Sequence, residues 1–275
     1  SLAEKAKIDM PYMMELTGKS EQELFEDLKG VIFLNPMHTS DEDGRPKYLP
    51  ADEYLSGNVR EKLEWARRSA ELYPEDYSEN VRALEAVQPV DLTASEISVR
   101  LGATWLPPEI AEQFMFELFG TPRYCQWNIH VHFSQYTGEW NVEGKSYDRT
   151  NVKAYNTYGT SRINGYKIME ETLNLKDVRI FDYIEDENGK KTAVLNKKET
   201  AIAQGKQELI KQAFADWIWQ DPERREKLTR LYNEKFNSTR PREYDGSHMS
   251  FVGINPEITL RPHQVNAIAH ILYGG

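Results

Sequence analysis

The sequence predicts an α+β fold that is predominantly helical, with two or three small antiparallel β-hairpins. Most apolar residues recur at the three- and four-residue spacings of amphipathic helices. A few short runs alternate apolar and polar residues, as half-buried strands do, and turn residues join them in pairs. With 275 residues, 39% of them hydrophobic, the chain can bury an ample core, as one large domain or as two to three small ones.

Residues 1–50 are predicted to form a helical, winged-helix-like part. Two short helical patterns come first, and Ser20 with Glu23 forms a capping box at the start of the second. A hairpin follows, with strands over 31–34 and 47–49 and a turn over 41–44. This order could place the second helix in a DNA major groove. That helix is rich in Asp and Glu, which favours protein docking or simple packing instead.

Residues 51–120 are predicted to be a helical part that starts with a helical hairpin. A long helix begins at Ala51 and ends before Pro74, and a second helix over 78–87 ends before Pro89. Because the connection between them is short, we expect the two helices to be antiparallel.

Two more helices are predicted before residue 121. Thr93 and Glu96 form a capping box for a short helix. Pro107 and Pro108 then begin an apolar helix that ends at Gly120.

Residues 121–237 are predicted to be a mixed α/β part, beginning with a half-buried hairpin over 124–143. His130 and His132 share the polar face of its first strand and could ligate a metal. Only Glu139, across the turn, adds a further ligand type nearby, so we predict no metal site. A second hairpin is predicted over 178–195, and long helices over 197–220 and 222–236.

The stretch 145–168 is the best candidate for nucleic-acid contact. It contains five basic residues and one acidic residue, Asp148, with tyrosines interleaved. The candidate DNA-binding residues are Lys145, Lys153, Tyr155, Tyr158, Arg162 and Lys167. Tyrosines that pack across a loop-rich sheet would explain the same pattern equally well.

Residues 238–275 are predicted to be an irregular linker followed by a helix that begins at Pro262. Its apolar residues fall on one stripe, which we expect to be buried. They are Val265, Ile268, Ala269 and Leu272.

The stretch Leu260-Arg-Pro-His-Gln264 resembles the adenine-reading element that opens the first motor domain of superfamily 2 helicases, particularly the Swi/Snf-like branch. Longer stretches resemble the region that precedes the helicase core in very large methylase–helicase proteins of phages and integrative elements. These stretches are 54–63, 94–105 and 196–204.

The resemblance implies that Gln264 reads adenine in the parent protein and that Arg261 supports that pocket. Tyr244 or Phe251 could supply the aromatic ring that often stacks on the adenine in this superfamily. ATP and Mg would bind the parent's motor, whose phosphate-binding loop follows shortly after the end of this chain. Residues 238–275 would then be the linker and first helix of a truncated motor domain.

Two absent motifs limit what this chain can do alone. It has no G-x-x-x-x-G-K-[ST] loop to hold the β- and γ-phosphates of a nucleotide, and no Asn-Pro-Pro-Tyr type motif of an adenine methylase. We therefore expect no cofactor in this chain, no ATP hydrolysis and no DNA methylation.

The composition limits the partners as well. A net charge of −10 is the wrong sign for a protein that neutralises phosphates over its whole surface, so any DNA contact must come from a local patch and be weak in isolation. No stretch approaches 18 apolar residues and the N-terminus lacks a signal-peptide layout, so we expect a soluble, cytoplasmic protein with no membrane partner.

These observations favour an accessory, DNA-positioning region of an ATP-dependent DNA helicase or translocase that is linked to a DNA methylase. Its partners would be DNA and the helicase motor of the same polypeptide. The alternative is a protein-interaction module that binds neither nucleotide nor DNA.

Overall fold

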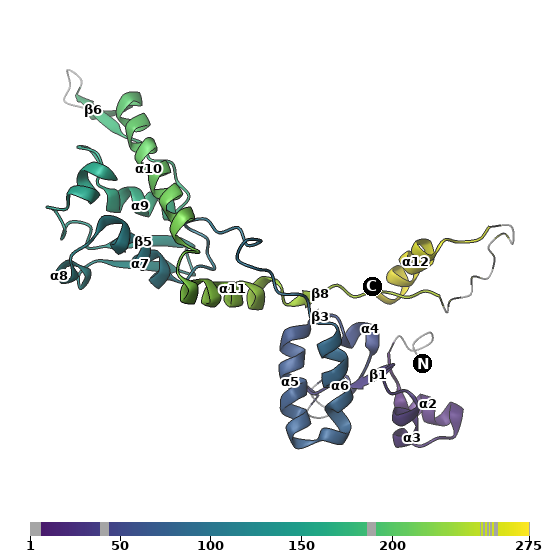
Figure 1. The fold of residues 1–275 in the computed structure, drawn as a ribbon. Coiled ribbons are helices and arrows are strands. Elements are labelled where there is room, and N and C mark those ends of the chain that lie inside the picture. Colours follow the sequence, from purple (N-terminus) through teal and green to yellow (C-terminus); the bar gives the residue numbers. More distant parts are fainter. Residues whose placement is uncertain are drawn as a thin grey trace. The chain divides into compact units, whose positions relative to one another are not determined.

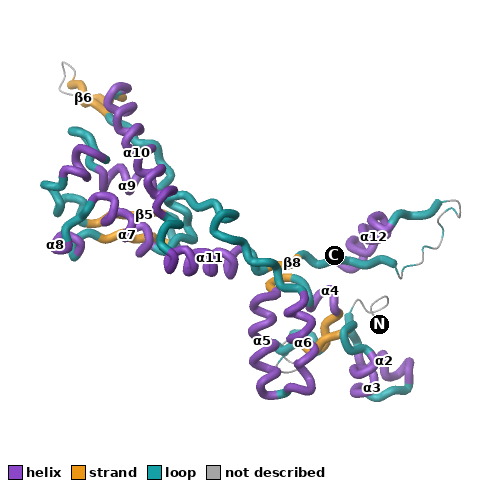
Figure 2. The backbone as a smooth tube through the Cα atoms, viewed as in Figure 1, coloured by secondary structure: helices purple, strands orange, loops and turns teal. Residues whose placement is uncertain are grey.

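The computed structural model describes residues 7–38, 44–185, 191–247, 249, 251, 253, 255 and 258–274. The chain divides into two compact units, which we consider separately. Unit 1 comprises residues 1–91 and 233–275, and unit 2 comprises residues 92–232. Within the described residues the fold is α+β and mostly helical, with four two-stranded antiparallel sheets (Figure 2), which confirms the predicted class.

The first elements of unit 1 among the described residues are α2 (Met10–Thr17), α3 (Glu21–Asp27) and the hairpin of β1 (Ile32–Leu34) and β2 (Tyr48–Pro50). The predicted capping box forms, because the Ser20 hydroxyl accepts from the Glu23 N–H and the Glu23 carboxylate accepts from the Ser20 N–H at 2.9 Å. A small core joins the helices to the hairpin. It consists of Met10, Leu24, Ile32 and Tyr48. The predicted turn over 41–44 falls mostly outside the described residues.

The long helix predicted from Ala51 is wrong: the chain forms α4 (Ala51–Tyr54), the two-residue strand β3 (Gly57–Asn58) and only then α5 (Val59–Leu72). Gly57 breaks the helix because its φ of 70° is left-handed. Asn58 then caps α5 by accepting from the Glu61 N–H at 3.1 Å.

The predicted helical hairpin is present, formed by α5 and α6 (Pro74–Ala86), which lie side by side (Figure 1). α6 starts at Pro74, earlier than predicted, since proline is well suited to the first helical position. Asn80 joins the hairpin to the first sheet by donating to the Leu34 carbonyl at 2.8 Å and to the Tyr54 hydroxyl at 2.9 Å.

The C-terminal segment returns to unit 1. β8 (Thr239–Arg240) pairs antiparallel with β3, and the Arg60 guanidinium donates to the Asn237 carbonyl at 2.9 Å. The last helix, α12 (Pro262–Gly274), begins at Pro262 as predicted. Its apolar stripe is only partly buried, because Ala269 is inaccessible whereas Leu272 is 60% exposed.

Unit 2 is built around one large core. Its elements in chain order are α7 (Pro108–Phe119), α8 (Arg123–Gln126), β4 (His130–Ser134), β5 (Glu139–Glu143), the π-helical turn η2 (Lys153–Thr157), α9 (Gly165–Leu173), β6 (Phe181–Glu185), β7 (Lys191–Leu195) and α10 (Lys197–Trp217). α11 (Pro222–Phe236) crosses the division between the units. α10 packs against α7 and α9, where Phe114, Tyr166 and Phe214 are fully buried.

Both predicted hairpins of unit 2 form, with Val131 opposite Val142 and Phe181 opposite Leu195. The predicted bounds are wrong at their starts: residues 123–126 form α8, so the first hairpin begins at His130 and not at residue 124, and the second begins at Phe181 and not at residue 178. The turn residues 186–190 of the second hairpin lie outside the described part of the chain. The short helix predicted after Thr93 is absent: Glu96 does accept from the Thr93 N–H at 2.8 Å, but the contact closes a turn.

Helical side chains, in place of further strands, cover both free edges of the β4–β5 sheet. On β4 the Val131 N–H donates to Glu112 of α7 at 2.8 Å. On β5 the Val142 N–H donates to Glu170 of α9 at 2.9 Å, and the Trp140 N–H donates to Asn174 at 2.9 Å. An isolated two-stranded sheet would otherwise leave these groups unpaired, so the three side chains complete it.

Candidate nucleic-acid interface

Two of the predicted DNA-binding lysines have a structural partner. Lys145 and Lys167 both bind the carboxylate of Glu170, Lys167 at 2.5 Å, and Lys167 also lies 3.0 Å from Glu171. The Glu170 side chain is only 10% exposed. Burial alone would raise its pKa, but hydrogen bonds from two lysines and a backbone N–H outweigh this effect and hold the pKa below its usual range. These lysines therefore serve first to neutralise a buried carboxylate.

The other predicted residues divide into packed and free side chains. Tyr155 and Tyr158 are partly buried against the core, and the Tyr158 ring lies 5.9 Å from the Phe119 ring. Arg162 forms an exposed ion pair with Asp182 at 2.8 Å. Lys153 is exposed, and its ammonium makes no ion pair or hydrogen bond with any residue that the structure describes.

A second surface was not predicted from the sequence. Three aromatic side chains on α8, directly after it and in the loop after β5 are largely exposed: Tyr124 is 73% exposed, Trp127 82% and Tyr147 62%. Arg123 and Arg149 are exposed beside them in the sequence. Aromatic residues next to arginines are a signal for such a surface, but the sequence pattern assigns Tyr124 and Trp127 to a half-buried hairpin.

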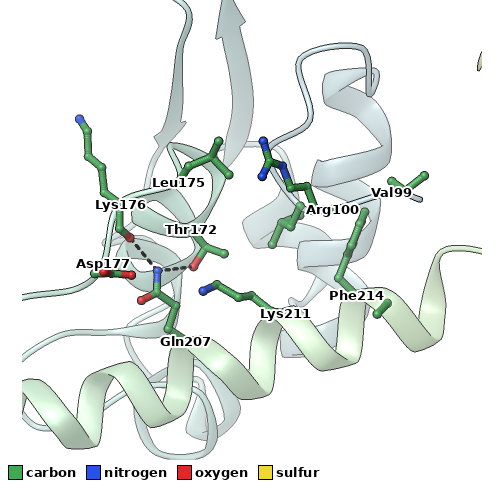
Figure 3. Close-up of a pocket in the computed structure, with 11 residues that line it drawn as sticks. Val99, Arg100, Thr172, Leu175, Lys176, Asp177, Gln207, Lys211 and Phe214 are labelled. Atoms are coloured by element: carbon green, nitrogen blue, oxygen red, sulfur yellow. Dashed lines mark hydrogen bonds between the residues drawn. The ribbon is translucent and has the colours of Figure 1, made fainter. Parts of the chain in front are cut away.

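Unit 2 also contains a pocket of about 320 Å³ between α9, α10 and the loop before α7 (Figure 3). Its floor is apolar, with Leu101 and Phe214 buried. Arg100, Lys176, Asp177 and Lys211 also line it, but Lys211 pairs with Glu208 at 2.7 Å and Lys176 with Glu139 at 3.8 Å.

Two close backbone features shape this pocket. Leu175 has a left-handed φ of 58°, which turns the chain sharply after α9. Gly102 lies so close to α9 that an added Cβ would be 2.3 Å from the Leu173 carbonyl oxygen. Gln207 is not free to bind a ligand: its amide donates to Thr172 and to the Lys176 carbonyl.

His130 and His132 lie on the same face of β4, with ring centroids 6.1 Å apart. Glu112 lies 3.5 Å from His130 and Glu143 lies 3.5 Å from His132, whereas Glu139, the acid noted across the turn, pairs with Lys176 at 3.8 Å. The two histidines thus have separate acidic partners, and among the described residues no group of three ligand-type side chains converges.

Comparison with known families gives two matches. Residues 100–238 match a model described as a domain of unknown function, DUF8437, which is just over half of the chain. The chain belongs to the DUF8437 family. The match coincides closely with unit 2, so the pocket and the exposed aromatic residues lie within the DUF8437 domain or at its boundary.

Outside the DUF8437 domain, residues 1–42 match a model described as "Probable helicase, winged helix domain". This match covers α2, α3 and β1 and indicates a helicase-associated region. No curated protein and no solved structure matches the chain. No helix among the described residues is long and apolar enough to cross a membrane.

α3 is the helix that the sequence could place in a DNA major groove, and lysines of unit 1 partly neutralise its acidic side chains. Glu21 pairs with Lys47 at 2.7 Å and Glu26 with Lys29 at 2.6 Å, and Asp27 pairs with Lys19. These are exposed pairs, which contribute little to stability. They offset part of the negative charge that the acidic residues of α3 carry.

The predicted nucleotide-reading residues lie at the start of α12, following the DUF8437 domain. Gln264 is exposed, and its side-chain oxygen accepts from the Arg261 N–H at 2.9 Å, so it caps the helix. Tyr244 is not free to stack on a base: the His270 ring covers it at 4.5 Å and the Arg242 guanidinium lies 4.9 Å from its centroid.

Charge is distributed unevenly between the two units. Residues 92–232 contain 19 Lys and Arg and 20 Asp and Glu, so unit 2 is nearly neutral although the whole chain carries −10. The acidic excess therefore belongs to unit 1. A nucleic-acid surface meets less electrostatic opposition on unit 2 than the net charge of the chain indicates.

Proposed function

We propose that this chain is the accessory region of an ATP-dependent DNA helicase or translocase and that it positions DNA for the motor of the same polypeptide. The match of residues 1–42 to a helicase winged helix domain carries this proposal. The arrangement of α2, α3, β1 and β2 supports it, because helix, helix and hairpin follow in the order of that domain. A linked DNA methylase and the Swi/Snf-like branch rest on the sequence resemblance alone.

In the parent protein, Gln264 and Arg261 would form part of the adenine pocket, and the motor would bind ATP and Mg. The position of Gln264 on the first turn of α12 supports this role, since an exposed amide there can still donate to a ring nitrogen. The parent gene provides a direct test. If no glycine-rich G-K-[ST] loop is encoded shortly after residue 275, the helicase assignment fails.

The predicted DNA-binding residues can be ranked by the interactions that each would have to break in order to bind a phosphate. The Lys153 ammonium has no partner among the described residues, so it would break no ion pair or hydrogen bond. Arg162 exchanges an exposed ion pair and a hydrogen bond to the Phe181 carbonyl, and an exposed pair contributes little. Lys145 and Lys167 would leave the buried Glu170 carboxylate without charge compensation, which costs more. We therefore expect Lys153 to contribute most and these two lysines least.

Fluorescence anisotropy with labelled DNA, measured across a salt series, tests the DNA-positioning role. Replacing Lys153, Arg162 and Lys167 together by Ala should weaken binding, and on a duplex the log–log salt slope should become less negative by about 0.9 for each phosphate that is no longer neutralised. The matched control is Arg67→Ala with Arg68→Ala, which should change neither affinity nor slope. Equal losses of affinity from both sets would show that the surface is misplaced.

The alternative, a protein-interaction module, has one observation in its favour. The β6–β7 hairpin leaves apolar side chains open to solvent, including Tyr183 at 72% and Ile184 at 58% exposed. Exposed apolar surface of this kind is typical of protein contacts. If the unmodified chain binds neither duplex nor single-stranded DNA near 50 mM salt, this alternative becomes the better account.

A further inference from the structure

Three large aromatic side chains on one small part of unit 2 have no structural role that burial could explain. Trp127 is 82% exposed, Tyr124 73% and Tyr147 62%, whereas Trp140 in the same sheet region is 3% exposed. Exposed tryptophan and tyrosine rings that contribute nothing to the core are typical of surfaces that bind a partner.

Two short distances show that the α8 segment and the loop after β5, which carry these rings, are adjacent. The Cys125 thiol lies 3.9 Å from the Tyr147 carbonyl oxygen. Gly144 lies so close to the chain after α8 that an added Cβ would be 1.8 Å from the Asn128 carbonyl oxygen. The two aromatic residues of the α8 segment and Tyr147 therefore belong to adjacent stretches of surface.

Exposed cations lie within the same segments. Arg123 is on α8, and Arg149 follows the loop after β5, where its guanidinium donates only to the Ser146 carbonyl at 3.0 Å. The Lys153 ammonium reaches the chain just before α8, since it lies 3.7 Å from where a Cβ on Gly120 would stand. None of these three cations forms an ion pair with a residue that the structure describes.

The one acidic residue among these cations does not oppose them at the surface. Asp148 is 2% exposed and its carboxylate accepts from the Tyr166 hydroxyl at 2.7 Å and from the Asn151 amide at 2.6 Å. It is turned into the core. The segments therefore present positive charge together with aromatic rings.

We propose that this area, the α8 surface, binds single-stranded nucleic acid. It comprises Arg123, Tyr124, Trp127, Tyr147, Arg149 and Lys153. Bases stack on the aromatic rings and the phosphates between them meet the cations, the combination by which proteins bind single strands without sequence preference. A duplex hides the faces of its bases, so the exposed rings give no advantage with duplex DNA. The proposal rests on the DNA-positioning role above and names the form of DNA.

The test is fluorescence anisotropy of the whole chain with a labelled oligothymidine and with a duplex of equal length. Trp127→Ala and Tyr124→Ala should each weaken single-strand binding at least about fivefold, the lower end of the effect of losing one base stack. Trp127→Phe, which keeps a ring, should restore most of the affinity. The replaced residues are exposed, so the melting temperature of each variant should match that of the unmodified chain.

Two matched controls identify the surface. Tyr136→Ala removes an equally exposed tyrosine from the β4–β5 turn, and Arg179→Ala removes an exposed arginine elsewhere on unit 2. Neither should change single-strand affinity. Arg149→Ala should both weaken binding and reduce the salt slope by about 0.7, the value for one phosphate of a single strand.

The outcomes separate this inference from the proposed function. If the unmodified chain binds DNA but Trp127→Ala and Tyr124→Ala bind single strands as tightly, the α8 surface is wrong while the DNA-positioning role stands. A loss as large for Tyr136→Ala, or an equal loss of duplex binding, also overturns it. If the unmodified chain binds no DNA at low salt, both proposals fail together.

Discussion

Replacing Glu170 by glutamine should lower the melting temperature of the protein at neutral pH much more than in acid. The Glu170 side chain is 10% exposed and accepts from the Val142 N–H at 2.9 Å and from Lys167 at 2.5 Å, and Lys145 pairs with the same carboxylate. Glutamine keeps the shape and an oxygen for the strand N–H. It removes the charge that the two lysines compensate and replaces one of the two acceptor oxygens by an NH2 group, which cannot accept from a lysine.

The magnitude follows from how exposed the partners are. The lysine side chains are 31% and 44% exposed, so the pair is neither a surface ion pair, worth about 0–1 kcal/mol, nor a fully buried one, whose disruption costs about 3–5 kcal/mol. We expect a loss of about 1.5–3 kcal/mol, the range of hydrogen bonds to charged groups. For a protein of this size that lowers the melting temperature by about 3–12 °C.

The lowered pKa of Glu170 determines how the stability difference changes with pH. The pKa of Glu170 is lowered in the folded protein, so its carboxylate contributes stability fully above the ordinary glutamate pKa and loses that contribution as the pH falls through the lowered value. The difference between the unmodified chain and Glu170→Gln should therefore shrink as the pH falls below about 4.

Differential scanning calorimetry at neutral pH and in acid measures this difference. Glu208→Gln is the control, because Glu208 forms an exposed ion pair with Lys211 at 2.7 Å and its side chain is 70% exposed. That variant should stay within about 0.5 kcal/mol of the unmodified chain. The reasoning is refuted if Glu170→Gln is as stable as the control at neutral pH, or if its loss is the same at both pH values.

Three further predictions concern the core, a tight turn and the nucleotide. Tyr166→Phe removes the hydroxyl that donates to the buried Asp148 carboxylate at 2.7 Å, and chemical denaturation should show a loss of about 1–3 kcal/mol. Gly144→Ala places a Cβ 1.8 Å from the Asn128 carbonyl oxygen at a φ of 69°, so we expect a larger loss or an insoluble protein, visible in expression and thermal unfolding. Calorimetric titration should show ATP binding no tighter than about millimolar, because a single amide contact from Gln264 cannot offset the several kcal/mol that association costs; micromolar, magnesium-dependent binding would contradict this.

The sequence predicted the elements whose signals are local. The capping box of Ser20 with Glu23, the alternation around Val131 and the proline at the start of α12 all appear where expected. Each depends on residues within a few positions of one another, so the chain itself supplies the information.

The wrong predictions concern elements whose local signals did not decide the structure. The helix predicted from Ala51 is interrupted at Gly57, which has a left-handed φ of 70°. Gly57 and Asn58 also pair with Thr239 and Arg240, residues far along the chain that no local pattern reveals. The contact between Thr93 and Glu96 forms without a helix behind it, because the Glu96 carboxylate can accept from the Thr93 N–H whether or not a helix follows. The Glu96 N–H donates to the Thr93 carbonyl, so the second bond of a capping box is not made.

The candidate site shows the same division between local and distant information. The stretch 145–168 is nearly free of acid in sequence because the carboxylates that bind its cations, Glu170, Glu171 and Asp182, lie just beyond it. Two of its lysines are needed to bury a glutamate that completes a strand edge. A count of charges within a sequence window therefore overstates the cations that are available to a ligand.

A chain with a net charge of −10 can bind a polyanion only where cations lack carboxylate partners. Arg123, Arg149 and Lys153 meet this condition among the described residues, and they lie in the segments where three aromatic rings are exposed. Lys153 belongs to both the predicted stretch and the α8 surface, so its replacement should weaken binding under either account. The variants that decide between them are Trp127→Ala, which affects the α8 surface alone, and Arg162→Ala, which affects the predicted stretch alone.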